Sequence, residues 1–219
     1  TRLAMTTSCP HRNRLLPVFL FMAKNKELFC QKVIAELLPP FGPNRESVLW
    51  EAIGRRFTGL NYLEADMMSR KNKDFVKSLF PHGAIYVSLL NQEAQDVIGQ
   101  VGKDSRGAAH MLSKIGFSYS HRVDPFDGGP HFSVNRDDIT LIKNACFGIA
   151  KIDSKLSSSN SLKWGLIGRY QPANDSGQRF RGIQAQFKFD SVNKGIILDE
   201  KSFSLLQADK NENICAIEF

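Results

Sequence analysis

The most informative segment of this chain begins with Asn91-Gln-Glu-Ala-Gln-Asp-Val-Ile-Gly-Gln-Val101 and ends with Asp124-Pro-Phe-Asp-Gly-Gly-Pro-His-Phe132. Between these two blocks the sequence predicts a second helix that ends in Gly-Phe, and then a strand with alternating polarity. A Gly-Gly-Pro turn follows, with an aspartate before it and a histidine after it. Packing alone does not require this combination at a turn. We therefore interpret the segment as the edge of an active site.

The composition is that of a soluble globular protein. The chain has 219 residues, of which 42% are hydrophobic and 23% are charged, enough to bury a sizeable core in one domain or in one domain with a small appendage. The net charge of +7 suits a phosphate-bearing partner, and a CoA thioester fits it as well as a nucleic acid does. Because the basic residues are scattered, a solvated surface is favoured and no nucleic-acid partner is expected.

The cysteine pattern and an N-terminal apolar run bear on the cellular compartment. The cysteines have no C-x-x-C spacing, so neither a zinc site nor a disulfide framework is expected, and a reducing cytoplasm is favoured. They are Cys9, Cys30, Cys146 and Cys215. The apolar run over residues 15–23 mimics a signal peptide, but Lys24 follows where a cleavage site would be, and the run is too short to span a bilayer. We expect a buried helix there and no membrane partner.

The first half of the chain is predicted to contain several helices and one buried strand. Apolar spacing predicts helices over residues 15–28, 46–57, 63–69 and 74–79, and a buried strand over residues 32–38. Pro17 is compatible with the first helix if it lies in the first turn. Asn61 is the expected N-cap of the helix over residues 63–69. Residues 84–87 are expected to form a short strand or an extended entry.

Helical and strand periodicities alternate in the middle of the chain. Apolar residues at helical spacing predict a helix that continues through Val101. A second helix is expected to have Ser105 as its N-cap and to stop at Gly116. Residues 117–123 alternate with period two, which predicts a half-buried strand.

After residue 143 the pattern becomes strand-rich. Strands are predicted over residues 146–152, 163–170, 180–189, 194–198 and 214–219, with a short helix over residues 200–207. We therefore divide the chain into an α/β domain over residues 1–143 and a small β-rich subdomain over residues 144–219. The second part offers no catalytic constellation.

Several blocks resemble the signature sequences of bacterial arginine N-succinyltransferases. The most specific blocks are Gln92–Val101 and Phe126–Pro130, and shorter ones cover residues 49–57, 64–66, 85–86 and 108–117. The similarity extends over roughly residues 15–142 and more weakly to Phe219. The resemblance implies an α/β (α+β) fold of the N-acyltransferase type, with a mixed sheet, flanking helices and the C-terminal β-rich subdomain. It also indicates that the N-terminal part of the family is lacking here.

The resemblance implies a reaction and its substrates. The family transfers a succinyl group from succinyl-CoA to the α-amine of L-arginine, the first step of succinyl-dependent arginine catabolism. Succinyl-CoA serves as co-substrate, and no bound cofactor and no metal are expected. The implied partners are L-arginine and succinyl-CoA, and the implied assembly is a homo-oligomer or a paired subunit in the cytoplasm. Arginine and ornithine both stay open as the acceptor.

The reaction needs a group that takes a proton from the amine and returns one to the thiolate, which a histidine with a near-neutral pKa can do. The family resemblance places an acid–base histidine directly after the Ile-Gly-Gln-Val block, where this chain has Gly102. We predict His131 as the catalytic residue instead, because it follows the glycine turn and is near Asp127 in sequence. His82, just before Gly83, is the second candidate.

The other histidines have structural interpretations. His121 shares a strand face with apolar residues and is interpreted as a core histidine, whereas His110 lies off the apolar stripe of its helix and is expected to be solvated. His11 lies in a stretch that matches the family poorly.

The chemistry of the substrates suggests binding residues. A guanidinium prefers carboxylates, so Asp127 in the turn and Glu93 on the predicted helix are the predicted substrate-binding residues. A helix-surface pair of Glu93 with Asp96 is the alternative for the second of these. For the acyl-CoA, the resemblance implies Leu3, and Arg12 is placed to meet phosphate oxygens, although the turn around it lacks the glycines of the superfamily's phosphate-binding turn.

Two other functions stay open. A degenerate or truncated, non-catalytic family member that acts as a partner subunit is favoured by Gly102 and by the glycine-free turn around Arg12. A basic nucleic-acid binder has only the net charge in its favour.

Overall fold

The chain folds into two compact units. The computed structural model describes residues 6–7, 16–71, 74, 78, 83–154, 156, 162–171 and 179–218. One unit, here called the terminal unit, combines Thr1–Gln31 with Arg136–Phe219, and the central unit consists of Lys32–Asn135. This partition differs from the sequence-based division between residues 143 and 144. The physical reason is that the first helix packs against the C-terminal strands.

The terminal unit is built on a mixed sheet. Its strands are β1 (Thr6–Thr7), β5 (Cys146–Ile152), β6 (Lys163–Gln171), β7 (Arg179–Asp190), β8 (Gly195–Leu198) and β9 (Asn213–Glu218). Their order is β1-β7-β6-β9-β5-β8, and a further pairing of β7 with β8 closes the sheet on itself. β1–β7 and β5–β8 are parallel pairs, and the other pairs are antiparallel. The predicted C-terminal strands are confirmed, but the mixed sheet lies largely after residue 143 rather than before it.

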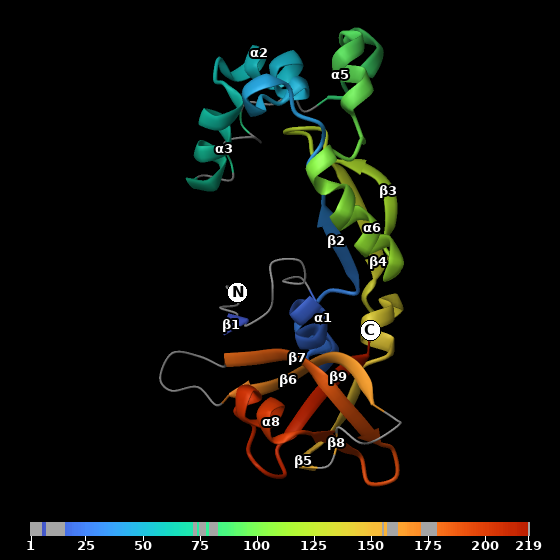
Figure 1. Cartoon of the computed structure of the whole chain (residues 1–219). Coiled ribbons are helices and arrows are strands. Elements are labelled where there is room, and N and C mark those ends of the chain that lie inside the picture. The colour runs from blue at the N-terminus through green and yellow to red at the C-terminus, as the bar shows by residue number, and fades with distance from the viewer. Residues whose placement is uncertain are drawn as a thin grey trace. The chain divides into compact units, whose positions relative to one another are not determined.

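Two helices cover opposite faces of this sheet (Figure 1). Helix α1 (Leu16–Lys24) packs on β6 and β9, with Leu20 beside Gly168. Helix α8 (Glu200–Leu206) contributes to the buried cluster around Ile167. Ile167 and Gly168 are neighbours on β6, so they lie on opposite faces of the sheet, Gly168 towards α1 and Ile167 towards α8. The predicted helix over residues 200–207 is confirmed.

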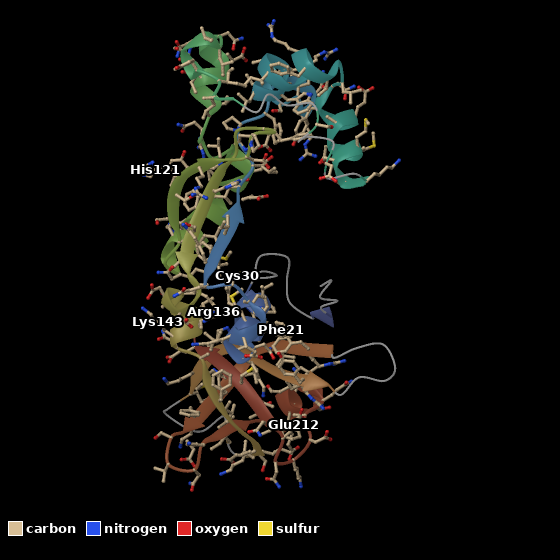
Figure 2. All side chains as sticks on the ribbon, turned by 180° about the vertical axis from the view of Figure 1, so that it is seen from behind. Phe21, Cys30, His121, Arg136, Lys143 and Glu212 are labelled. Atoms are coloured by element: carbon tan, nitrogen blue, oxygen red, sulfur yellow. The ribbon has the colours of Figure 1, made fainter. Side chains whose placement is uncertain are left out.

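Helix α1 confirms the predicted buried N-terminal helix, and Pro17 lies in its first turn. Figure 2 shows Phe21 of this helix against the strands. Its ring centroid lies 5.6 Å from that of Tyr170 and 5.6 Å from that of Phe180. In the described part of the chain, no helix has the length and apolar character needed to cross a membrane.

Arg136, the first residue after the central unit, is bonded to residues 26–31, which precede that unit. Its guanidinium donates to the carbonyl oxygens of Lys26 and Phe29 at 2.6 and 2.9 Å, and its backbone N–H donates to the carbonyl oxygen of Gln31 at 2.6 Å. The short helices around it are η2 (Lys26–Leu28), η7 (Arg136–Asp138) and α7 (Thr140–Lys143). These contacts join residues 26–31 to the segment that leads into the C-terminal strands.

The central unit contains a three-stranded antiparallel sheet in the order β2-β4-β3. The strands are β2 (Lys32–Glu36), β3 (Ser118–Val123) and β4 (Pro130–Asn135). The strand predicted as buried over residues 32–38 is shorter and alternates between exposed and half-buried residues, because it lies at an edge of the sheet. The prediction of full burial was wrong. Strand β4 was not predicted, since a turn was expected where it begins.

Helices of the central unit gather beyond the C-terminal end of β2 (Figure 1). They are η3 (Pro43–Arg45), the π-helix η4 (Trp50–Gly54), α2 (Arg55–Thr58), α3 (Tyr62–Lys71), η5 (Val87–Leu89) and α5 (Gln92–Val97). Next in the chain are η6 (Lys103–Ser105) and α6 (Arg106–Lys114), and α6 lies beside the strands of this unit (Figure 1). Asn61 caps α3 as predicted: its Oδ1 accepts from the N–H of Glu64 at 2.9 Å, and the Glu64 carboxylate accepts from the N–H of Asn61 at 2.9 Å.

Several predicted boundaries in this unit need correction. The helix expected to continue through Val101 ends at Val97, because Ile98 is extended and Gly99 has a φ of 73°. Of the two alternatives predicted for residues 84–87, the extended entry is observed, because residues 84–86 form no strand and lead into η5. Ser105 is at the N-cap position of α6 without a side-chain cap bond, and Gly116 ends that helix with a φ of 104°, as predicted. Most of the predicted helix over residues 74–79 lies outside the described residues.

Trp50 is the centre of the core that joins these helices. It is fully buried, and its ring stacks on Phe126 with centroids 4.3 Å apart and an interplanar angle of 24°. Its Nε1–H donates to the carbonyl oxygen of Leu60 at 2.9 Å. Tyr62 and Ala65 of α3 pack against the same cluster. The Trp50 ring therefore links the π-helix, α3 and the turn that precedes β4.

Trp50→Ala is expected to destabilise the protein by about 3–5 kcal/mol, because it leaves a cavity beside Phe126 and an unpaired carbonyl at Leu60. The matched control is Trp164→Ala, since Trp164 is 54% exposed. That change is expected to cost less than about 1 kcal/mol. Urea unfolding followed by circular dichroism measures both free energies. Equal losses for the two variants would contradict the assignment of Trp50 as the core of the central unit.

Candidate functional site

The Asp124–Pro130 turn is a tightly bonded backbone structure. The N–H of Gly128 donates to the carbonyl oxygen of Asp124 at 2.8 Å. The N–H of Asp124 donates to the carbonyl oxygen of Gly129 at 2.9 Å. Gly128 has a φ of 82°, which a residue with a side chain rarely adopts. A Cβ at Gly129 would lie 2.3 Å from the carbonyl oxygen of Leu37. Both glycines are therefore required by the local geometry.

Asp127 is buried inside this turn, with only 7% of its surface exposed. One carboxylate oxygen accepts from the N–H of Gly129 at 2.8 Å, and the other accepts from the hydroxyl of Tyr62 at 3.4 Å. Burial raises the pKa of this carboxyl, and the hydrogen bond from Gly129 opposes the shift. Burial together with the nearby Asp127 raises the pKa of Tyr62. These contacts give Asp127 a structural task, and its role in substrate binding stays a prediction.

The turn brings the two signature blocks into direct contact. The N–H of Gly99, in the Gln92–Val101 block, donates to the carbonyl oxygen of Gly128 at 2.9 Å. Gly99 also lies under the side chain of Tyr119, whose hydroxyl would be 2.6 Å from a Cβ at that position. A backbone hydrogen bond thus joins the two blocks, which are almost thirty positions apart in the sequence.

Gly102 packs against the end of the β2 segment. Its N–H donates to the carbonyl oxygen of Leu38 at 2.8 Å, and a Cβ at this position would lie 2.3 Å from the carbonyl oxygen of Pro39. No side chain fits there unless the backbone moves. This is the position at which the family resemblance places an acid–base histidine, so the conformation seen here suits glycine and not that histidine.

His131 lies on β4 and pairs with Glu36 across the β2–β4 ladder. Its Nε2 is 3.8 Å from a carboxylate oxygen of Glu36 and makes no hydrogen bond among the described residues. The side chain is 18% exposed. Asp127, expected from sequence as the partner of His131, is bonded to Gly129 and Tyr62 instead. Sequence reasoning missed Glu36 because strand pairing joins residues almost a hundred positions apart.

The remaining predicted residues have different outcomes. His121 is exposed on β3 (Figure 2), at a register shift where its φ is 55°, so its interpretation as a core histidine was wrong. The shift interrupts the strand alternation on which that interpretation rested, and the His121 ring lies tilted to that of Tyr119 with centroids 4.9 Å apart. His110 is exposed on α6, as predicted. The candidates Leu3, Arg12, His11 and His82 lie outside the described residues.

Glu93 lines a hollow of about 590 Å³ in the central unit. One wall comes from η4 and α2, and the other from η5 and the start of α5. Carboxylates, one guanidinium and apolar side chains line it, including Glu46, Glu51, Arg56, Phe57 and Leu89. Sequence reasoning found Glu93 but not the glutamates opposite it. Among the described side chains, no group of three or more metal-ligating residues gathers to form a metal site.

Comparison with known proteins places the sequence in a family. The model of the family described as arginine N-succinyltransferase beta subunit matches residues 13–141. The chain belongs to the arginine N-succinyltransferase family. An arginine N-succinyltransferase of Escherichia coli strain 55989 is 37% identical over 197 residues, which cover 90% of this chain and 55% of that protein. One from Shigella boydii serotype 18 is 30% identical over 206 residues, covering 91% of this chain and 57% of its own length.

A solved structure agrees with the arginine N-succinyltransferase assignment. The arginine/ornithine succinyltransferase subunit AI from Pseudomonas aeruginosa superposes with a TM-score of 0.71 at 28% identity, covering 94% of this chain and 56% of that one. The expected α/β (α+β) acyltransferase fold is thereby confirmed. The chain spans little more than half the length of these relatives.

Gly102→Ala is expected to destabilise the protein by about 1–3 kcal/mol, because the added methyl group overlaps the backbone carbonyl of Pro39. Gly107→Ala is the matched control, since a Cβ there meets nothing within 4 Å. The control is expected to be neutral or to stabilise by up to about 1 kcal/mol, because alanine favours the helix. Thermal unfolding measures both. A neutral Gly102→Ala would show that position 102 has room for a side chain.

Asp127→Asn is expected to change how stability depends on pH. The folded-state pKa of Asp127 is raised, so its favourable contribution is present below the ordinary aspartate pKa and is lost as pH rises through the folded value. Asparagine keeps the acceptor for the Gly129 N–H but does not titrate. The stability of the variant relative to the unsubstituted protein should therefore increase from acid to neutral pH.

Asp190→Asn provides the contrast, because hydrogen bonds from Asn193 lower the pKa of Asp190. Its relative stability should decrease over the same pH range. Urea unfolding at several pH values measures both differences, and slopes of the same sign would contradict the account of Asp127.

Proposed function

We propose that this chain forms part of an enzyme that transfers the succinyl group of succinyl-CoA to the α-amine of L-arginine, the first step of succinyl-dependent arginine catabolism. The observation that carries the proposal is the contact of the two family signature blocks through Gly99 and Gly128. The match of the family model over residues 13–141 supports it. Succinyl-CoA is a co-substrate in this proposal, and no resident cofactor takes part.

The reaction breaks a thioester C–S bond and forms an amide C–N bond. The neutral amine attacks the thioester carbonyl, the amine loses a proton, and the departing thiolate gains one. In the proposal His131 carries this proton. Its Nε2 is buried, makes no hydrogen bond to a described residue and lies 3.8 Å from a carboxylate oxygen of Glu36. Glu36 is a positioning residue here.

The other parts of the proposal rest on sequence. We propose Leu3 and Arg12 for the acyl-CoA, with Arg12 meeting phosphate oxygens. A homo-oligomer or paired subunit is the proposed assembly. The cytoplasm is the proposed compartment, and the described cysteines Cys30, Cys146 and Cys215, which are free thiols, agree with it.

A second candidate function is a non-catalytic partner subunit. The packing of Gly102 against Pro39 favours it, because the position that the family gives to an acid–base histidine has no space for a side chain. The two candidates differ in one measurable respect, namely whether thiol is released from succinyl-CoA when arginine is present.

His131→Ala is expected to lower kcat by roughly a hundredfold or more, the usual effect of losing acid–base help. His110→Ala, at an exposed position on α6, is the control and should keep full activity. Thiol release from succinyl-CoA with arginine, using the complete polypeptide that contains this chain, measures both. Unchanged turnover in His131→Ala would remove His131 from the mechanism. Absence of turnover in the unsubstituted protein would favour the partner-subunit function.

A further inference from the structure

We infer that the hollow of the central unit is the binding site for the acceptor amino acid, with its glutamates on the guanidinium, its apolar wall on the aliphatic stem and Arg56 on the α-carboxylate. This inference rests on the proposed function, because it names the place where that reaction's acceptor binds. It involves only described residues of the central unit.

The hollow has the size and setting of a small-molecule site. Its volume of about 590 Å³ lies within the range of roughly 300–1,000 Å³ that is typical of ligand pockets. The wall formed by η4 and α2 is fixed from behind by the buried Trp50, which belongs to η4. The opposite wall is fixed through Ala94, which follows Glu93 on α5 and is fully buried. Both walls are thus anchored in the core.

Carboxylates from three separate segments converge on this space. Glu46 follows η3, Glu51 lies on the π-helix, and Glu93 lies on α5. Glu51 already accepts from Arg55 at 2.9 Å, whereas the carboxylates of Glu46 and Glu93 make no hydrogen bond or ion pair with a described residue. Asp96, three residues further along α5, accepts from Gln92 at 2.7 Å and does not line the hollow, and both Glu93 and Asp96 are exposed. Two carboxylates are therefore available for a cationic ligand.

The walls also carry apolar side chains that are exposed to solvent. Phe57 is 49% exposed, Leu89 is 78% exposed and Ile85 is 39% exposed. Side chains of this size gain when apolar ligand atoms replace water. A bare metal ion or an inorganic cation offers no such atoms, whereas the three methylene groups of an arginine side chain do. The apolar wall therefore selects an organic cation with an aliphatic stem.

Arg56 gives the hollow a positive group as well. Its Nε–H donates to the carbonyl oxygen of Ala52 in its own helix at 3.0 Å, and its terminal nitrogens make no further bond to a described residue. A guanidinium fork binds a carboxylate in two-point fashion. Glutamates and one arginine around an apolar wall complement a ligand with a cationic end, a methylene stem and a carboxylate. L-Arginine has this arrangement.

Isothermal titration of the complete polypeptide tests the inference. Glu93→Gln is expected to weaken L-arginine binding roughly 10- to 100-fold, since it removes a charge-assisted hydrogen bond. Asp96→Asn removes the same charge from the same helix outside the hollow and should leave binding unchanged. Two further ligands separate the ends of the site: agmatine, which lacks the carboxylate, and L-norvaline, which lacks the guanidinium. Glu93→Gln should weaken agmatine but not norvaline, and Arg56→Gln should weaken norvaline but not agmatine.

The outcomes separate this inference from the proposed function. Arginine binding that follows the predicted pattern, without any turnover of succinyl-CoA, would support the site and reject the proposed activity. Turnover with an unchanged KM for arginine in Glu93→Gln would keep the activity and overturn the site. Undetectable arginine binding to the unsubstituted protein, or equal effects of Glu93→Gln and Asp96→Asn, would overturn the site as well.

Discussion

A buried carboxylate that accepts a hydrogen bond from a glycine N–H holds the central unit together. Asp127 is removed from water, which is unfavourable for its charge unless donors surround it, and the N–H of Gly129 and the hydroxyl of Tyr62 supply them. The bond fixes the turn before β4. Within this turn, the carbonyl oxygen of Gly128 accepts from the N–H of Gly99, and the ring of Phe126 stacks on Trp50. The turn also determines where β4 begins.

The groups proposed to function in binding and proton transfer depend on this turn without being part of it. Strand β4 begins at the residue after Gly129, so the position of His131 opposite Glu36 follows from the turn. The Trp50–Phe126 stack fixes the π-helix, and with it one wall of the hollow that Glu93 lines. Asp127 therefore fixes the conformation of the turn. The His131–Glu36 pair is proposed to transfer the proton, and the hollow is proposed to bind the acceptor amino acid.

Sequence reasoning succeeded where the information was local. Strand-like segments located the C-terminal strands, and Asn61 and Gly116 marked helix boundaries, because capping and left-handed backbone conformations depend on one or two residues. The family blocks led to the glycine turn and to His131. The failures came from contacts between distant segments. Nothing near Glu36 in sequence indicates that it faces His131, and the burial of Asp127 depends on Tyr62, 65 positions away.

Amide hydrogen exchange tests the central claim most directly. If the Asp127–Gly129 bond organises the unit, the amides of Gly99 and Gly129 should exchange only through the same opening that releases the amides of β4, with equal free energies of opening. Fast exchange of the Gly99 and Gly129 amides while those of β4 stay protected would show that the turn opens independently of the sheet, which contradicts the account.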